Sequence, residues 1–518
     1  MLRARHGFEA ALRASSYPPS ILTRKNCHSP YTGGQRLQWR PNWAGSGSWL
    51  IHLGNPGFTC LRAVGMAVSM RQEFLDVHKQ SNLVNSEQLL AAGELPSLLP
   101  RSGNGFQFVA YGDCCIGPPE PGRGHEEHLA AIHRGIHRLE PKPEFVCFLG
   151  NLIWGLTKEH GPNDDGDSLS DEWATKLSGE MKPLTDLGVP VFRIPGNHDT
   201  MTPISETVWR KVFPEISKNG PEGQEGLSWY ERHEDILIIG ISVYATAMGS
   251  PFTMMGGRVD YAWVDRVLSE HADAKYRLVL GHSPVHLVNG YNAPKWTMLP
   301  EFGEPFWNVL AKHGVTAYLC SHVIAFDFQV HQGVPQITAG GAGTNSGPGG
   351  CMPAPAEYHH SVQMAVDEFG LRGQALDMDG TARETFEWPL RRDGILEWSF
   401  TGGPLSPQAA RVLAAGSSPR EAYPRVRISL DGYQPRINVL LYDPADIYPV
   451  CWSGPEIDIS QRFDFTVAID PNLGPGGVLA RAGGGPFSSL VTDAPTGYKA
   501  NGRPDTWEFS DEVQVSQQ

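Results

Sequence analysis

Short apolar runs alternate with amphipathic stretches from Phe106 onward, and this alternation predicts the secondary structure. Short continuous apolar runs are typical of buried strands. We predict such strands at Phe106–Tyr111, Phe145–Leu149, Val189–Ile194, Ile236–Val243, Arg277–Leu280 and Val315–Leu319. We predict amphipathic helices at Glu126–Leu139, Asp171–Leu187, Asp260–His271 and Glu304–His313. Strands that alternate with helices build a layered α/β domain.

The later part of the chain contains only strand patterns. Further short strands are predicted to complete a second sheet, around Ala325–His331, Gln336–Ala339, Ser361–Val366 and Leu371–Asp377. After about residue 395, apolar segments such as Phe463–Ile469 alternate with turns rich in Gly and Pro. We therefore expect an all-β sandwich over residues 395–518, and its turns near Asn472–Arg481 favour a concanavalin-like jelly roll.

The length of 518 residues is too great for one compact core, so two domains with extensions are expected. Residues 1–70 contain eight Lys or Arg against one acid, Glu9, and are predicted to be a disordered extension. A basic segment of this kind is typical of organellar targeting, or indicates that the true start is Met66 or Met70. Residues 71–105 are interpreted as a leader or linker to the α/β domain, residues 106–390.

Charge and cysteine content narrow the possible partners. The net charge of −14 argues against general binding to nucleic acid, which needs a basic face. The eight cysteines form no Cys-x-x-Cys pair, so we expect them to be mostly reduced and the protein to be cytoplasmic. No run of about 18 apolar residues is present, so no membrane span is predicted.

Polar residues follow five successive predicted strands. The segments are Gly-Asp113-Cys-Cys115, Gly-Asn151-Leu-Ile-Trp154, Gly-Asn197-His198-Asp199, Gly-His282-Ser-Pro-Val-His286 and Ser-His322-Val-Ile324. Ligand sites of open α/β sheets lie at the carboxyl ends of the strands, and a preceding Gly permits a sharp turn there. One such segment is an ordinary turn with a solvated His, but five in this order predict a single site.

The order of these segments resembles that of calcineurin-like metallophosphoesterases. The stretch from Lys312 to His322, followed by Gly-Gly-Ala-Gly near residue 341, is similar to the last metal-binding segment of small purple acid phosphatases. The resemblance implies a layered αββα sandwich. It also implies two metals bridged by a carboxylate, with a hydroxide that attacks a phosphate ester.

Three residues match the ligands of the second metal in this family: Asn197, His282 and His322. One carboxamide and two imidazoles suit a divalent ion, and zinc, manganese and iron are the candidates. His198 matches the residue that steadies the transition state or protonates the leaving group, and Asp199 is placed to orient that imidazole. His286 is expected near the substrate.

The ligands of the first metal match less well. Asp113 corresponds to the opening aspartate, and Asn151 replaces the bridging aspartate with one neutral carbonyl oxygen. Trp154 and Ile324 stand at two further ligand positions and cannot donate to a metal. Cys115 stands where many members have His, and we interpret it as a buried thiol, with a ligand to a soft ion as the alternative. We therefore expect one divalent metal and doubt a second.

Two functions remain open at this point. The first is a metal-dependent phosphoesterase with a degenerate first metal site, acting on a phosphate ester. The second is a catalytically inactive relative that serves as a binding or scaffold module. The C-terminal β-sandwich is a candidate to bind a ligand or another protein. Membership of a fold family does not decide between these functions, because activity depends on the site.

Overall fold

A computed structural model describes the chain, which is divided into two units between Asn82 and Leu83. The described residues all belong to the second unit. They are 94–115, 125–155, 166–200, 202–249, 256–289, 296–344, 358–389, 396–402, 404, 411–417, 424–430, 436–441, 450–458, 460–469, 477–492 and 513–515. The predictions for residues 1–70, and most of the predicted linker, lie outside them.

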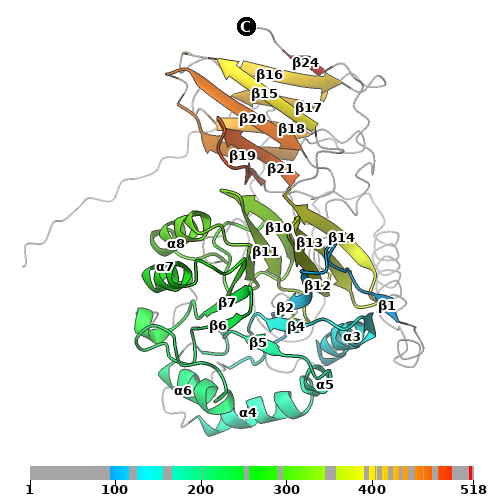
Figure 1. Cartoon of the computed structure of the whole chain (residues 1–518), viewed down its shortest axis with the longest axis vertical. Coiled ribbons are helices and arrows are strands. Elements are labelled where there is room, and N and C mark those ends of the chain that lie inside the picture. The colour runs from blue at the N-terminus through cyan, green and yellow to red at the C-terminus, as the bar shows by residue number, and fades with distance from the viewer. Residues whose placement is uncertain are drawn as a thin grey trace, which may run out of the picture. The chain divides into compact units, whose positions relative to one another are not determined.

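Two six-stranded sheets form the centre of the α/β domain (Figure 1). The first has the order β14 (Ala382–Trp388), β13 (Gly370–Asp377), β12 (His360–Asp367), β2 (Phe106–Tyr111), β4 (Phe145–Phe148) and β5 (Val191–Arg193). The second has the order β10 (Phe326–His331), β11 (Val334–Ala339), β9 (Ala317–Cys320), β8 (Tyr276–Gly281), β7 (Ile236–Ile241) and β6 (Trp229–His233). Strands β2, β4 and β5 are parallel to one another, as are β11, β9, β8 and β7.

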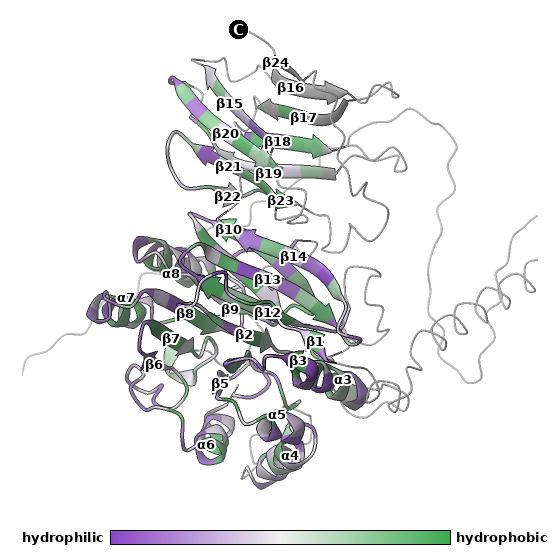
Figure 2. Ribbon diagram, turned by 45° about the vertical axis from the view of Figure 1, so that its right-hand side comes forward, coloured by the Kyte–Doolittle hydropathy of each residue, from purple (hydrophilic) through white to green (hydrophobic). Residues whose placement is uncertain are grey.

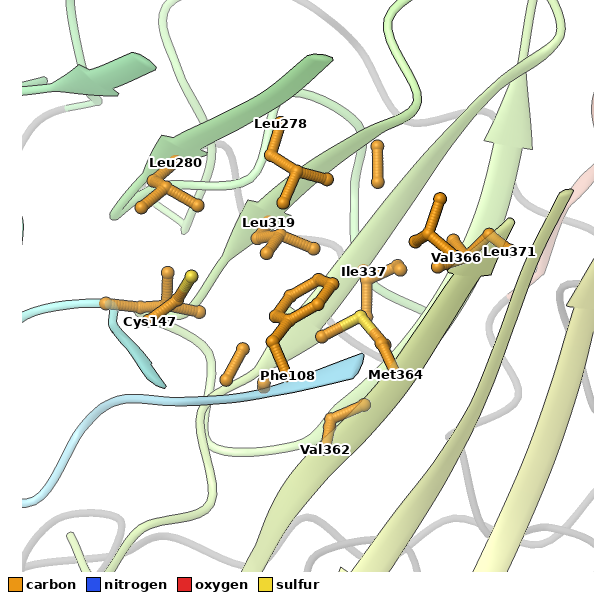
Figure 3. Close-up of a cluster of buried hydrophobic side chains, with 14 of the residues drawn as sticks. Phe108, Cys147, Leu278, Leu280, Leu319, Ile337, Val362, Met364, Val366 and Leu371 are labelled. Carbon is orange, nitrogen blue, oxygen red and sulfur yellow. The ribbon is translucent and has the colours of Figure 1, made fainter. Parts of the chain in front are cut away.

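The two sheets pack face to face and share one hydrophobic core. Figure 3 shows Phe108 of β2 and Met364 of β12 opposite Leu278, Leu319 and Ile337 of the second sheet. Strands buried on both faces are mostly hydrophobic, as the colouring of β7 shows (Figure 2).

Helices cover the outer face of each sheet. Those packed on the first sheet are α3 (His125–Arg138), α4 (Asp167–Ser178), α5 (Lys182–Asp186) and α6 (Pro203–Val212). Those on the second sheet are α7 (Tyr261–Glu270) and α8 (Pro300–Lys312). The predicted layered α/β architecture is therefore confirmed.

The helices differ from the prediction in two places. The helix predicted over Asp171–Leu187 is interrupted after Ser178, because Gly179 ends α4 and α5 starts afresh with Pro183 in its first turn. Helix α6 was not predicted, although Thr202 caps it by accepting from the Ser205 N–H and Pro203 occupies its first turn. The sequence thus contained the start signals of this helix, a capping Thr followed directly by Pro.

The C-terminal part is antiparallel β-structure. One sheet has the order β15 (Leu396–Gly402), β20 (Phe463–Ile469), β21 (Val478–Ala482) and β22 (Ser488–Ser489). The other has the order β23 (Val491–Thr492), β19 (Val450–Glu456), β18 (Arg436–Leu441), β17 (Pro424–Leu430), β16 (Arg411–Ser417) and β24 (Val513–Val515). Side chains of both sheets, Phe465 and Trp452 among them, pack in one core. The all-β prediction is confirmed, and the jelly roll stays a prediction.

Among the helices of the described residues, none combines the length and the apolar character needed to cross a bilayer.

Candidate metal centre

Five polar side chains lie just beyond the carboxyl ends of parallel strands of both sheets. Asp113, Asn151 and Asn197 follow β2, β4 and β5, while His282 and His322 follow β8 and β9. Three of them have left-handed backbones, with φ of 57° at Asp113, 64° at Asn151 and 66° at His322. This conformation is uncommon outside glycine and is tolerated best by Asn, Asp and His. The sharp turns it produces direct the five side chains toward one another.

Hydrogen bonds determine how the side-chain amide of Asn151 is oriented. Its Oδ1 accepts from the backbone N–H of His198 at 3.0 Å, so this position must hold the oxygen. Its Nδ2 donates to Asp113 Oδ1 at 2.8 Å and to Asn197 Oδ1 at 3.1 Å. The opposite orientation would set an oxygen against the carboxylate and an NH₂ group against an N–H. The sequence offered Asn151 as a metal ligand, whereas the structure turns its NH₂ group, and not its oxygen, toward the site.

The carboxylate of Asp113 accepts hydrogen bonds at both oxygens. Oδ1 accepts from Asn151, and Oδ2 accepts from the Ser321 hydroxyl and from the backbone N–H of His322. Burial raises the pKa of Asp113, and the nearby His322 ring and these three donors act in the opposite direction. The Asp113 carboxylate thus lies inside the site with its lone pairs largely engaged by the protein.

Three acceptor atoms face each other beside this pair. His282 Nδ1 must donate to the Leu149 carbonyl at 2.7 Å, so in the neutral ring Nε2 carries a lone pair. Burial lowers the pKa of His282 to about 3, which keeps the ring neutral. Its Nε2 lies 3.0 Å from Asn197 Oδ1, and His322 Nδ1 lies 3.1 Å and 3.3 Å from these two atoms.

This triangle of Asn197 Oδ1, His282 Nε2 and His322 Nδ1 fits a single cation. Lone pairs at such distances repel one another unless a proton or a metal lies between them. Donors that bind one ion at about 2.1 Å lie about 3.0 Å apart in an octahedral set and about 3.4 Å apart in a tetrahedral one. The observed separations of 3.0, 3.1 and 3.3 Å fall between these values. In the described part of the chain, no group of three or more His, Cys, Asp or Glu side chains is placed to hold a metal, so the mixed set with Asn197 is the candidate.

His198 lies beside the triangle with one nitrogen engaged. Its Nδ1–H donates to the carbonyl of Trp154 at 2.9 Å, and the two rings stack with centroids 4.5 Å apart. Burial lowers the pKa of His198, so the ring is neutral near pH 7 and its Nε2 is an acceptor. Trp154, at a position where the family has a ligand, thus fixes the orientation of this imidazole.

The carboxylate of Asp199 binds backbone N–H groups. Its Oδ2 accepts from Asn151 at 2.6 Å and from Gly196 at 2.9 Å, and Oδ1 accepts from Leu152 at 3.1 Å and from Ile153 at 3.4 Å. Burial raises the pKa of Asp199 to about 7, while these donors lower it. The hydrogen bond to the neighbouring imidazole expected from the sequence is replaced by this anchoring of the Asn151 loop.

His286 belongs to a different cluster. Its ring stacks on His331 at 3.6 Å and meets the Trp307 ring edge to face at 4.5 Å. The side chain of Gln336 accepts from the backbone N–H of His286 at 2.9 Å and donates to its carbonyl at 2.9 Å. The contacts of His286 within the described residues therefore lie around β10, β11 and α8, and the structure does not bring it together with the other candidates.

Cys115 is buried beside Asp113. Burial and the charge of Asp113 raise the pKa of its thiol well above the ordinary value. A thiol of this kind is a poor ligand and a poor nucleophile. Its burial and the contact of Sγ with the Thr344 hydroxyl at 3.7 Å favour the buried-thiol interpretation over the soft-ion ligand.

The sequence did not indicate Tyr244 and Ser321, which also reach the site. Ser321 donates to Asp113, and Tyr244 Oη lies 3.3 Å from His322 Nε2. A usable signal existed for Tyr244, because it stands just past the end of β7 as the other site residues stand past their strands. In the sequence, however, it continues an apolar run and is typical of core.

Comparison with known proteins concerns the α/β domain that carries these residues. Residues 106–326 match the family model described as calcineurin-like phosphoesterase. A search of the curated proteins gave no match. The match over this segment confirms the family resemblance that the five motifs predicted.

Several solved structures are similar to part of the chain. GAP50, described as the anchor in the inner membrane complex of Plasmodium, is 14% identical with a TM-score of 0.37, over 56% of this chain and 90% of that one. A dimetal phosphatase from Danio rerio is 16% identical with a TM-score of 0.37, over 54% and 98%. A purple acid phosphatase from yellow lupin (Lupinus luteus) seeds is 14% identical with a TM-score of 0.40, over 56% and 55%.

Proposed function

We propose that the domain binds one divalent metal ion through Asn197, His282 and His322 and hydrolyses a phosphate ester. The observation that supports this proposal is the triangle of Asn197 Oδ1, His282 Nε2 and His322 Nδ1, in which the Leu149 carbonyl holds His282 through its Nδ1–H. Two imidazoles and one carboxamide leave further coordination positions open, as catalytic metal sites do. A divalent ion held there supplies a Lewis acid for a phosphoryl oxygen and lowers the pKa of water.

The residues of the chain supply the remaining chemistry. His198 presents the lone pair of Nε2 as an acceptor, because its Nδ1–H is bound to Trp154. It accepts a proton from the attacking water, or a hydrogen bond from the ester, and it becomes a donor once protonated. Asp199 holds the loop that carries Asn151, and Asn151 in turn holds the backbone of His198. Each of these contacts limits the movement of the imidazole.

The orientation of Asn151 supports a site for one ion and not two. Two cations at close range need an anionic bridge against their mutual repulsion. At the bridging position, Asn151 turns two N–H bonds toward the oxygens of Asp113 and Asn197. An N–H group repels a cation, so the volume next to Asp113 is unsuited to a second ion.

The same observation favours a second candidate function, a non-catalytic binding or scaffold domain. If one ion does not suffice for hydrolysis, the domain keeps the geometry of the site and binds a ligand or partner without turning over a substrate.

Metal content tests the proposed site. We expect the purified full chain, equilibrated with Mn²⁺ or Zn²⁺, to retain one ion per chain in elemental analysis. His282→Ala and His322→Ala should abolish this binding. His233→Ala is the matched control, because His233 is an exposed histidine that contacts Glu231 on the surface. Two stoichiometric ions, or undiminished binding by both site variants, would overturn the proposal.

Turnover separates the two functions. We expect hydrolysis of an aryl phosphate with added Mn²⁺ or Zn²⁺, and a large loss in His198→Ala while the bound metal remains. Equal rates for the parent protein and His198→Ala would exclude the hydrolase and leave the binding module.

A further inference from the structure

Tyr244 lies on the side of His322 that faces away from the triangle, because it contacts Nε2 while Nδ1 faces the triangle. Its side chain is buried, with 3% exposure. The hydroxyl lies 2.6 Å from Ser283 Oγ and 3.3 Å from His322 Nε2. Its ring packs against both imidazoles, with centroids 5.8 Å from that of His322 and 6.1 Å from that of His282.

The two nitrogens of His322 have different neighbours, so the position of its proton decides what the site can bind. Nδ1 faces Asn197 Oδ1 and His282 Nε2, and Nε2 faces Tyr244 Oη. With the proton on Nε2, the Nδ1 lone pair points into the triangle and can bind a metal. With the proton on Nδ1, the N–H group donates into the triangle, and its hydrogen lies where a metal ion would bind.

Tyr244 and Ser283 can satisfy either tautomer. When Nε2 carries the proton, Tyr244 Oη accepts a hydrogen bond from Nε2–H and donates its own hydrogen bond to Ser283 Oγ. When Nδ1 carries the proton, Ser283 donates to Tyr244, and Tyr244 donates to Nε2. Both hydroxyl hydrogens are free to rotate, so each hydroxyl can donate in either direction. All groups keep a partner in each state.

We propose that Tyr244, supported by Ser283, is a positioning residue that accepts a hydrogen bond from the Nε2–H of His322 in the tautomer that binds a divalent metal, so that metal uptake leaves no buried donor of this ring without a partner. This inference rests on the proposed metal site and assigns a role to residues outside the ligand set. Partners of this kind fix the tautomer and ring orientation of a ligating histidine, and their loss typically costs about 10–100-fold in metal affinity.

The structure offers a matched control for the loss of one buried phenolic hydroxyl. Tyr318 is also fully buried in the second-sheet core, and its hydroxyl donates to the carbonyl of the same Ser283 at 2.6 Å. Within the described residues, this hydroxyl is hydrogen-bonded to the Ser283 backbone and to neither imidazole. Tyr318→Phe therefore removes a hydroxyl from the same core and leaves the Nε2 partner of His322 in place.

Calorimetric titration of the full chain with Zn²⁺ or Mn²⁺ tests the role of Tyr244. We expect Tyr244→Phe to weaken metal binding about 10–100-fold at unchanged stoichiometry, and Tyr318→Phe to leave the affinity unchanged. Ser283→Ala should cause a smaller loss, because Tyr244 can still accept from His322. It also provides a second variant if Tyr244→Phe folds poorly.

A second readout follows the tautomer itself. In nitrogen NMR of the zinc-bound protein, His322 should carry its proton on Nε2, and in metal-free Tyr244→Phe the Nδ1–H tautomer should increase relative to the metal-free parent. A purely structural role would lower stability without moving this equilibrium.

The outcomes separate the two proposals. If the parent protein binds no metal, the proposed site is refuted and this inference with it. If the parent binds one ion and both Tyr244→Phe and Ser283→Ala bind it equally well, only the role of Tyr244 is refuted.

Discussion

Asn151→Asp tests whether the Asn151 amide compensates the charge of Asp113. In the structure, the Nδ2 of Asn151 donates to Asp113 Oδ1 at 2.8 Å. The substitution places a second carboxyl group there, and Asn197 Oδ1 loses a donor as well. The metal-free variant should therefore be less stable than the parent protein.

The size of this effect has an upper limit set by protonation. Two unit charges about 2.8 Å apart repel by about 6 kcal/mol at an effective dielectric constant of about 20. The new carboxyl can avoid this cost by keeping its proton, which costs about 1.36 kcal/mol for each pH unit above its ordinary pKa of about 3.9. At pH 7 this second route costs about 4 kcal/mol, so it sets the limit. At pH 5 the same route costs only about 1.5 kcal/mol.

The pH dependence has a definite sign. The variant carboxyl has a higher pKa in the folded than in the unfolded state, so the stability difference from the parent is small near pH 4 and grows as the pH rises. Added Mn²⁺ should reduce the difference at pH 7, because a bound cation compensates the second carboxylate.

Urea unfolding of the full chain at pH 5 and pH 7, with and without Mn²⁺, measures these differences. Asn289→Asp is the matched control, because Asn289 is fully buried in the same domain and its Nδ2 donates to Asp327 Oδ1 at 3.0 Å. It should lose stability in the same way without recovery by Mn²⁺. A variant as stable as the parent at pH 7, or equal recovery of both variants, would refute the reasoning.

Two further predictions concern the anchor of the site and its surroundings. Asp199→Asn leaves one acceptor oxygen where four backbone N–H groups now bind. We therefore expect the free energy of unfolding to fall by about 2–4 kcal/mol and metal binding to weaken. An unchanged unfolding free energy in urea and an unchanged metal affinity in titration would contradict this prediction. Burial lowers the pKa of His360 to about 4, so the folded state loses stability as the pH falls from about 6.5 to 4, where only the unfolded chain takes up the proton. His360→Gln should remove about 3 kcal/mol of this acid-dependent loss. Urea unfolding at pH 7 and near pH 4 measures it, and an unaltered pH dependence would count against the assignment.

The strands were predictable because a continuous apolar run such as Phe145–Leu149 suits a strand buried on both faces. The helix predicted over Asp171–Leu187 was wrong at Gly179, where the periodic pattern continues although the backbone turns. The spacing of apolar residues indicates which face of a helix is buried. The position of a helix end depends instead on one or two residues whose conformational preferences are weak.

The order of the site segments was also predictable, since each polar group follows a strand. The direction of each side chain was not. The orientation of Asn151 depends on the backbone N–H of His198, which lies 47 positions away in the sequence. Asp199 adjoins His198 in the sequence, yet the turn directs its carboxylate to the opposite side, onto the Asn151 loop. His286 illustrates the same limit, because a loop that leaves β8 carries it to Trp307 and His331.

The amide of Asn151 has a consequence for how the site behaves when metal is scarce. In a two-metal centre, facing anions are held together by ions that chelators can remove. Here the NH₂ group of Asn151 donates hydrogen bonds to both Asp113 and Asn197, and a chelator cannot remove this group. The hydrogen-bond partners of these two oxygens are therefore encoded in the sequence and are independent of the metal content of the surroundings.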